Sequence, residues 1–362
     1  MRNSQDKITI RQSMFVLTTI VFSPSVRFFP NYTARIAKQA SWLAPFVAAL
    51  IMLPMLFISV SIAKKYKDAS FITVMDDICT KAVSRVITFL YILWLTLILA
   101  LYVRYYAERL LTTILPNVDM LVFIIPMLIL SAVVARKNAV VLARMSEIIL
   151  PVITVFFVLC VIGVLPEVKI KNLTPISYLD ALPVLYSSLG IIAIWSYMPF
   201  IFHFSSIISG KESIKKIGLQ TLIAILFISF FSIATAVGVL GDSIIRLIPI
   251  PFFAVIKQLS LFDSIERIEA FIVSVWLLSD FVLITFFTII ALDIMKNMFK
   301  LTDPKPLAGI YTVIVFFISL YLVRSEFELK ELSDTVIVYL NIAFGVIIPA
   351  LIFIVGKVRK KL

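Results

Sequence analysis

Long apolar stretches recur along the sequence and constrain the fold more than any other feature. The stretch from Trp42 to Ala63, for example, is apolar on every side and shows no alternation of apolar and polar residues. A helix needs about 20 apolar residues to cross the hydrocarbon core of a bilayer, whereas the strands of a membrane barrel alternate. The sequence therefore predicts an all-α polytopic membrane protein whose surroundings are a lipid bilayer.

The composition agrees and excludes several classes of function. Charged residues make up 15% of the 362 and hydrophobic residues 61%, whereas soluble domains carry about 25% charged residues. The only two cysteines, Cys79 and Cys160, are too far apart to indicate a disulfide framework or a zinc site. We find no nucleotide-binding glycine loop, catalytic triad or zinc motif. We therefore expect no enzyme, no cofactor and no metal site.

We predict about ten membrane helices in two sets of five, separated by the polar loop from Pro166 to Asp180. The first five cover residues 8–29, 42–63, 86–115, 120–135 and 145–165. The second five cover residues 182–204, 217–240, 268–294, 307–323 and 335–355. Residues 1–362 then form a single transmembrane domain, with one repeat at about 8–165 and the other at about 182–355.

The positive charge fits a membrane protein and not a nucleic-acid-binding one. Although the formal net charge is +12, most Lys and Arg residues lie in short segments between the apolar stretches. The clusters occupy residues 2–11, 64–85, 136–144, 211–216, 296–305 and 357–361. Because cytoplasmic loops of membrane proteins are enriched in Lys and Arg, an even number of helices with both termini in the cytoplasm fits best.

Two predicted helices are interrupted at matching places of the two halves. The first contains Ser23-Pro24-Ser25, and the sixth contains Gly190 followed by the run from Ser196 to Pro199. Proline removes a backbone donor, and lipid cannot satisfy the freed groups. Paired interruptions point to an inverted-repeat transporter fold with a site at the bilayer midplane. The alternative is that these prolines only kink their helices.

Two motifs resemble those of a known family. One is the run from Ala143-Arg144 through Glu147 to Pro151, and the other is Ile265-Glu266-Arg267-Ile268-Glu269, followed by Trp276. Together with the opening run from Ile8 to Gln12, they resemble the spore germination B-subunits. These form the endospore germination (GerAB-type) family of the amino acid–polyamine–organocation transporter superfamily. The resemblance covers essentially the whole chain, although Ser23-Pro24-Ser25 stands where the family usually carries glycines.

The resemblance implies a LeuT/APC-like 5+5 inverted repeat with the first and sixth helices interrupted. It also implies a subunit of a spore nutrient germinant receptor, located in the inner membrane of the spore beside an A-type subunit and a lipoprotein C-type subunit. Such a subunit senses a small nutrient such as an amino acid. The alternatives are a proton- or sodium-coupled amino acid transporter, with Asp280 or Glu108 as the coupling group, and an ion conduit formed by the complex.

Candidate site residues follow from the interrupted helices and from ionisable or aromatic groups inside the membrane. An aspartate at a helix centre costs about 2.5–3.5 kcal/mol on insertion scales, so Asp280 needs a partner, a cation or a proton. The candidates for ligand binding are Ser23, Pro24, Ser25, Tyr102, Tyr106, Gly190, Trp195, Tyr197 and Asp280. The candidates for coupling or gating are Arg27, Arg104, Glu108, Glu266, Arg267 and Glu269.

Several of these residues have plainer interpretations. Arg27 and Arg109 reach the outer headgroups if they lie at the membrane interface, and we favour this role for Arg109. Arg104 and Glu108 are spaced to pair across one helical turn. The lone histidine, His203, has no second ligand nearby in the sequence, so it does not indicate a metal site.

Overall fold

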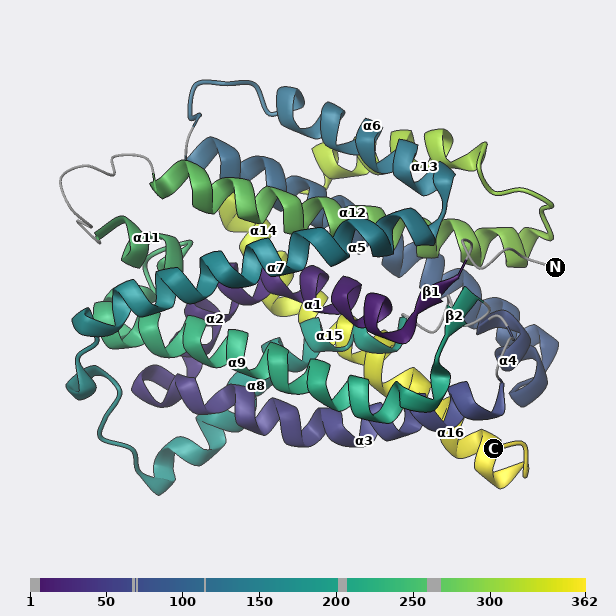
Figure 1. Ribbon diagram of the computed structural model, residues 1–362, viewed down its shortest axis with the longest axis horizontal. Coiled ribbons are helices and arrows are strands. Elements are labelled where there is room, and N and C mark those ends of the chain that lie inside the picture. Colours follow the sequence, from purple (N-terminus) through teal and green to yellow (C-terminus); the bar gives the residue numbers. More distant parts are fainter. Residues whose placement is uncertain (1–6, 67–68, 70, 114, 201–206, 259–267) are drawn as a thin grey trace.

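The computed structural model describes residues 7–66, 69, 71–113, 115–200, 207–258 and 268–362. Within these residues nearly all the chain is helical, and the long helices run side by side along the long axis of the molecule (Figure 1). In the described part of the chain, seven helical segments are long and apolar enough to cross a membrane. They are Phe29–Lys65, Lys81–Thr113, Ala139–Glu167, Tyr178–Phe200, Ile214–Leu240, Phe271–Phe299 and Glu326–Val358. The chain is therefore a multi-pass membrane protein.

The first half of the chain contains one short strand and seven α-helices. These are β1 (Ile8–Thr9), α1 (Ile10–Arg27), α2 (Phe29–Ala37), α3 (Ala44–Lys65), α4 (Phe71–Ile78), α5 (Lys81–Thr113), α6 (Leu121–Lys137) and α7 (Ala139–Val164). A short 3-10 helix, Lys38–Leu43, joins α2 to α3. The predicted stretches 8–29, 42–63, 86–115, 120–135 and 145–165 fall on α1, α3, α5, α6 and α7.

The second half has the corresponding long helices and a divided last helix. Its elements are α8 (Ala181–Trp195), β2 (Ile208–Ser209), α9 (Ile214–Leu240), α10 (Asp242–Ile245), α11 (Pro251–Gln258), α12 (Ile268–Phe299), α13 (Leu307–Tyr321), α14 (Glu326–Leu332), α15 (Val338–Ile342) and α16 (Ile348–Val358). Two π-helical turns, Ser333–Ile337 and Ala343–Ile347, separate α14, α15 and α16. The predicted stretches of this half fall on α8, α9, α12, α13 and the run from α14 to α16. The short helices α2, α4, α10 and α11 were not predicted.

Helix α12 is the centre of the bundle. It packs against α1, α5, α6 and α7, and 89% of its most apolar window is buried, compared with 28% for the run from α14 to α16. The buried polar groups of α12, such as Ser279 and Asp280, therefore have to find partners within the protein.

The first membrane helix divides four residues later than predicted. Helix α1 remains α-helical through Ser23-Pro24-Ser25 and ends at Arg27; Phe28 then separates it from α2. The Phe28 N–H still donates to the Pro24 carbonyl at 2.8 Å. Pro24 cannot donate to the carbonyl four residues earlier. The Ser25 hydroxyl donates to the neighbouring Val21 carbonyl at 2.7 Å. In the sixth predicted helix, α8 ends at Trp195, directly before the predicted break at Ser196.

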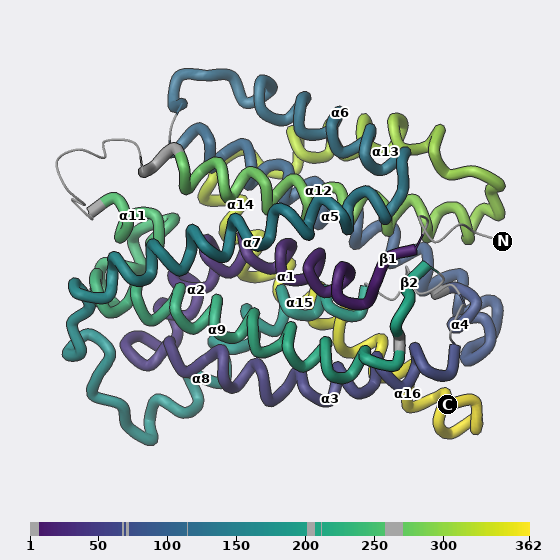
Figure 2. The backbone as a smooth tube through the Cα atoms, viewed as in Figure 1, coloured from purple at the N-terminus to yellow at the C-terminus, as the bar shows by residue number. Residues whose placement is uncertain are grey.

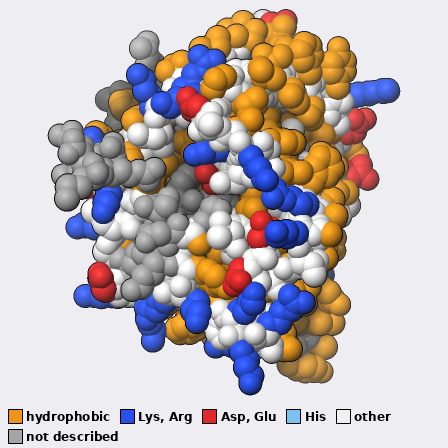
Figure 3. Space-filling model, turned by 90° about the vertical axis from the view of Figure 1, so that its right-hand side faces the viewer, with side chains coloured by type: hydrophobic (Ala, Val, Ile, Leu, Met, Phe, Trp, Pro, Cys, Tyr) orange, Lys and Arg blue, Asp and Glu red, His pale blue; other side chains and the backbone are white. Residues whose placement is uncertain are grey.

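The segments before α1 and after α8 meet at one end of the bundle, which we call the terminal end. Strand β1 pairs in parallel with β2, with Ile8 opposite Ile208, and the end of α16 lies at the same end (Figure 2). The Gln12 amide donates to the Glu147 carboxylate at 2.9 Å, so the two motifs that contain these residues meet in space. Lys and Arg side chains gather over this end (Figure 3).

Candidate functional site

An ion pair joins three helices in the core of the protein. The guanidinium of Arg109 on α5 contacts the carboxylate of Asp280 on α12, and their side chains are only 3% and 6% exposed. Ser23 of α1 completes the cluster: its hydroxyl donates to Asp280 Oδ1 at 2.6 Å and accepts from Arg109 Nη1 at 3.0 Å. The Arg109 guanidinium also lies 5.2 Å from the ring centroid of Trp276, a favourable cation–π distance. A cation that belongs to the chain therefore lies between α1 and α12.

A serine hydroxyl from α12 bridges two backbone groups of α1 beside this cluster. Ser279 Oγ donates to the Thr19 carbonyl at 2.6 Å and accepts from the Ser23 N–H at 3.2 Å. These two backbone groups are ordinary i, i+4 partners in an α-helix. A side chain between such partners loosens a helix locally. Ser279 and Asp280 of α12 thus hydrogen-bond to the first helix at Ser23. The sequence predicted an interruption at this residue, but the chain remains helical there.

A second polar network surrounds the end of α8. The hydroxyls of Tyr197 and Tyr102 lie 2.9 Å apart, and the Asn341 side-chain amide donates to Tyr197 Oη at 2.8 Å. Asn341 Oδ1 in turn accepts from the Trp94 indole N–H at 3.1 Å, and the Asn341 carbonyl accepts from the Ser196 hydroxyl at 3.1 Å. Asn341 lies in α15 directly before a π-helical turn, and such turns are frequent at functional sites. This network joins α5, the α8 break and α15.

One donor next to this network lacks a partner. Trp195 is completely buried, and its Nε1–H donates to no residue that the structure describes. Leaving a buried donor unpaired costs about 1–3 kcal/mol. An acceptor outside the described residues would remove this penalty, and the ligand-binding role of Trp195 stays a prediction.

A small charged cavity lies near the opposite end of α1. Its volume is about 40 Å³, and its lining includes Pro249 and Ile250, which directly precede α11. Figure 1 shows α11 at the end of the bundle opposite the terminal end. Its charged lining residues are Arg27, Arg35, Glu108, Arg109, Glu326 and Lys330. Residues of both charge signs therefore line this cavity. Arg109 lines this cavity and also holds Asp280, so the cavity and the ion pair are adjacent.

The structure brings several of the predicted residues to these clusters. Ser23, Asp280, Tyr102 and Tyr197 lie in the buried networks, and Trp195 is buried beside Ser196 of the second network. Arg27 stacks on the ring of Tyr105, with 3.6 Å between the guanidinium carbon and the ring centroid. Arg104 and Glu108 form the predicted pair at 2.9 Å, and Tyr106 is buried on the same helix.

Other predicted residues have different surroundings. The face of Gly190 is filled by the ring of Tyr32, and an added Cβ would collide with it; glycine at this position allows α2 and α8 to pack closely. Pro24 and Ser25 are buried within α1. Glu266, Arg267 and His203 lie outside the described residues, and the side chain of Glu269 is likewise not described.

Two central residues were missed or misassigned. We favoured an interfacial role for Arg109, but its side chain is buried and paired with Asp280. Asn341 was not singled out, although it is the only asparagine in its apolar stretch. A lone amide inside a membrane helix is itself a signal of this kind, because it must find a hydrogen-bond partner.

Comparison with known proteins identifies a family and two relatives. The family described as spore germination protein matches residues 7–327. Two relatives from Bacillus subtilis (strain 168) are each 22% identical: spore germination protein KB, over 98% of this chain and 96% of the relative, and the putative spore germination protein YfkT, over 97% of each.

Two solved transporters share the fold. Mhp1, a nucleobase-cation-symport-1 family transporter solved with bromovinylhydantoin bound, superposes with a TM-score of 0.69 at 12% identity, over 94% of this chain and 77% of that one. MhsT, solved in complex with L-phenylalanine, gives 0.61 at 12% identity, over 95% and 97%. The fold is therefore the LeuT-type fold of these transporters. Together with the match over residues 7–327, this shows that the chain belongs to the spore germination protein family.

Proposed function

We propose that this protein is the B-subunit of a spore nutrient germinant receptor. It senses a small nutrient, most simply an amino acid, between α1, α5, α8 and α12. The observation that carries the proposal is the ion pair between Arg109 and Asp280, which lies in the core and engages α1 through Ser23.

The pairing of the carboxylates favours a sensor over an ion-coupled carrier. Coupling to sodium or to a proton requires a carboxylate that can exchange its partner during the cycle. Asp280 already has Arg109 as its partner, and Glu108 already has Arg104. Fixed internal cations at both carboxylates make an exchangeable ion unnecessary for stability.

Nutrient binding acts by shifting an equilibrium between two conformations, which requires different affinities for the two states. Arg27 and Glu326 line the charged cavity next to this site, and their opposite charges suit the carboxylate and the ammonium group of an amino acid that passes it. At the terminal end, the β1–β2 pairing and the Gln12–Glu147 hydrogen bond keep this side closed. The A-type and lipoprotein C-type subunits respond to this shift in conformation. The protein lies in the inner membrane of the spore, with both termini in the cytoplasm.

Germination of spores that lack this protein tests the proposal. In a strain without other nutrient receptors, we expect spores lacking this protein to lose their response to at least one nutrient, while germination by a non-nutrient trigger is unchanged. A normal response of such spores to every nutrient tested would refute the proposal.

An amino acid carrier is the second candidate, and its support is the fold shared with MhsT, which was solved in complex with L-phenylalanine. Uptake into liposomes separates the two. The carrier predicts concentrative uptake that the Asp280→Asn substitution abolishes, whereas the receptor predicts binding without accumulation.

A further inference from the structure

A long groove runs between α1, α7 and α9, away from the site described above. Its volume is about 760 Å³, which lies within the range of about 300–1,000 Å³ typical of small-molecule sites. Met14 and Thr18 of α1 and Ile228 of α9 are buried at its floor. The rim residues Ala224 and Phe227 are exposed. Because α7 and α9 are both membrane-spanning, the groove opens toward the bilayer.

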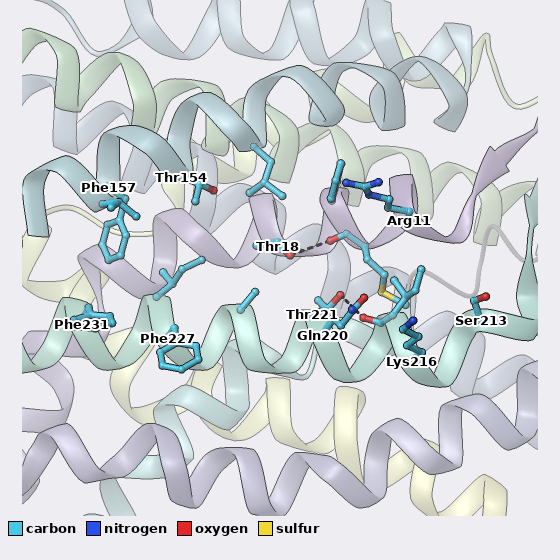
Figure 4. Close-up of a pocket in the computed structure, with 17 residues that line it drawn as sticks. Arg11, Thr18, Thr154, Phe157, Ser213, Lys216, Gln220, Thr221, Phe227 and Phe231 are labelled. Atoms are coloured by element: carbon cyan, nitrogen blue, oxygen red, sulfur yellow. Dashed lines mark hydrogen bonds between the residues drawn. The ribbon is translucent and has the colours of Figure 1, made fainter.

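The two ends of the groove differ in chemistry. Figure 4 shows Arg11, Lys216 and Ser213 at one end, and Phe157, Phe227 and Phe231 toward the other. Neither Arg11 nor Lys216 forms an ion pair with any residue in the described part of the chain. The α9 N-cap, Ser213, lines this end and makes no side-chain capping bond, and a helix N-terminus carries a partial positive charge.

The dimensions identify the kind of molecule that fits. Lys216 and Phe231 are 15 positions apart on one helix, which corresponds to about 22 Å at 1.5 Å per residue. One leaflet contributes about 15 Å of hydrocarbon, half of the roughly 30 Å core. The groove therefore has a basic mouth at the headgroup level and an apolar channel long enough for an acyl chain. A water-soluble nutrient would leave most of this apolar length without contacts.

We propose that this groove binds one anionic phospholipid. Its phosphate lies between Arg11 and Lys216 at the terminal end of the bundle, and an acyl chain lies along Phe157, Phe227 and Phe231. The occupant contacts α1 directly, so it supports the helix that carries Ser23 from the side opposite α12. The lipid site is independent of nutrient sensing, and its test uses no germination readout.

Native mass spectrometry of the full chain, purified in detergent, tests the proposal with phosphatidylglycerol and phosphatidylcholine as probes. We expect retention of phosphatidylglycerol, with a preference that high salt weakens. Lys216→Gln is expected to lower the affinity for phosphatidylglycerol about fivefold, the effect of about 1 kcal/mol for one basic residue near a lipid surface.

A matched control lies one residue away. Lys215→Gln makes the same change of charge on the same helix turn, but the Lys215 ammonium lies 5.3 Å from the Phe57 ring centroid and does not line the groove. We expect it to leave lipid retention unchanged, and we expect Ala224→Trp, which fills the groove, to reduce retention of both lipids. Equal retention of the two lipids by the unaltered chain, or equal effects of the two lysine substitutions, would overturn the proposal. So would an Ala224→Trp variant that keeps its lipid but loses a co-expressed receptor subunit, because the occupant would then be a protein helix.

Discussion

Replacing Arg109 with methionine removes the buried cation and leaves Asp280 charged without its main partner. Both side chains are less than a tenth exposed, and breaking a buried pair by removing one member costs about 3–5 kcal/mol. The Ser23 hydroxyl still donates to Asp280 at 2.6 Å, and a hydrogen bond to a charged group contributes about 1.5–3 kcal/mol. We therefore expect a loss of about 3 kcal/mol, at the lower end of that range.

The double variant Arg109→Met with Asp280→Leu separates this reasoning from simple loss of packing. Replacing a whole buried ion pair by apolar groups is often neutral or stabilising, so the double variant should be more stable than Arg109→Met alone. Arg246→Met is the control, because the Arg246–Asp242 pair is about one third exposed and such pairs contribute about 0–1 kcal/mol.

Thermal unfolding in detergent, followed with a thiol-reactive dye that labels the buried Cys160 as the protein opens, measures these differences. If Arg109→Met unfolds at the same temperature as the unaltered chain, or if the double variant is less stable than both single variants, the ion pair does not stabilise the core as described.

Three further predictions concern other parts of the molecule. Tyr197→Phe removes two hydroxyl hydrogen bonds of 2.8 and 2.9 Å and should destabilise the chain by about 1–3 kcal/mol, measured by the same dye assay. Gly345→Ala should also destabilise it, by about 1–3 kcal/mol, because an added Cβ meets the side chain and carbonyl of Ser196; Gly309→Ala meets only the end of a flexible arginine and should be tolerated. Asp77 accepts a hydrogen bond from Lys361 and another from the Tyr66 hydroxyl, and these lower the pKa of its carboxyl. The contact between α4 and the C-terminal tail should therefore persist above the ordinary pKa of aspartate and weaken as the pH falls through the lowered value, seen as faster hydrogen exchange in the tail.

The sequence predicted the long membrane helices well because their signal is local. A stretch such as Trp42 to Ala63 is apolar over its whole length, and this is enough to place α3. The connecting helices α2, α4 and α11 were missed because they contain only eight or nine residues. Helices this short are stable mainly through tertiary packing, which the sequence does not display.

Individual residues of the site could be predicted from the sequence, but which residues pair with each other could not. Asp280 stood out because a charge inside a membrane helix is costly, whereas its partner Arg109 is 171 positions away and lies near the end of a helix. From the sequence alone, that arginine is equally compatible with the membrane interface. Only the packing of α5 against α12 brings the two together. Asn341 was not predicted because its side chain is neither charged nor aromatic.

The most direct test of the central claim uses Trp195, whose indole N–H is buried and has no partner among the described residues. Trp195→Phe removes this donor without breaking a hydrogen bond within the described protein. If a nutrient accepts that bond, the nutrient concentration for half-maximal germination should rise about 2–12-fold, the effect of about 0.5–1.5 kcal/mol for one hydrogen bond, while maximal germination is retained. An unchanged dose response of Trp195→Phe spores would contradict a nutrient site at the α8 break.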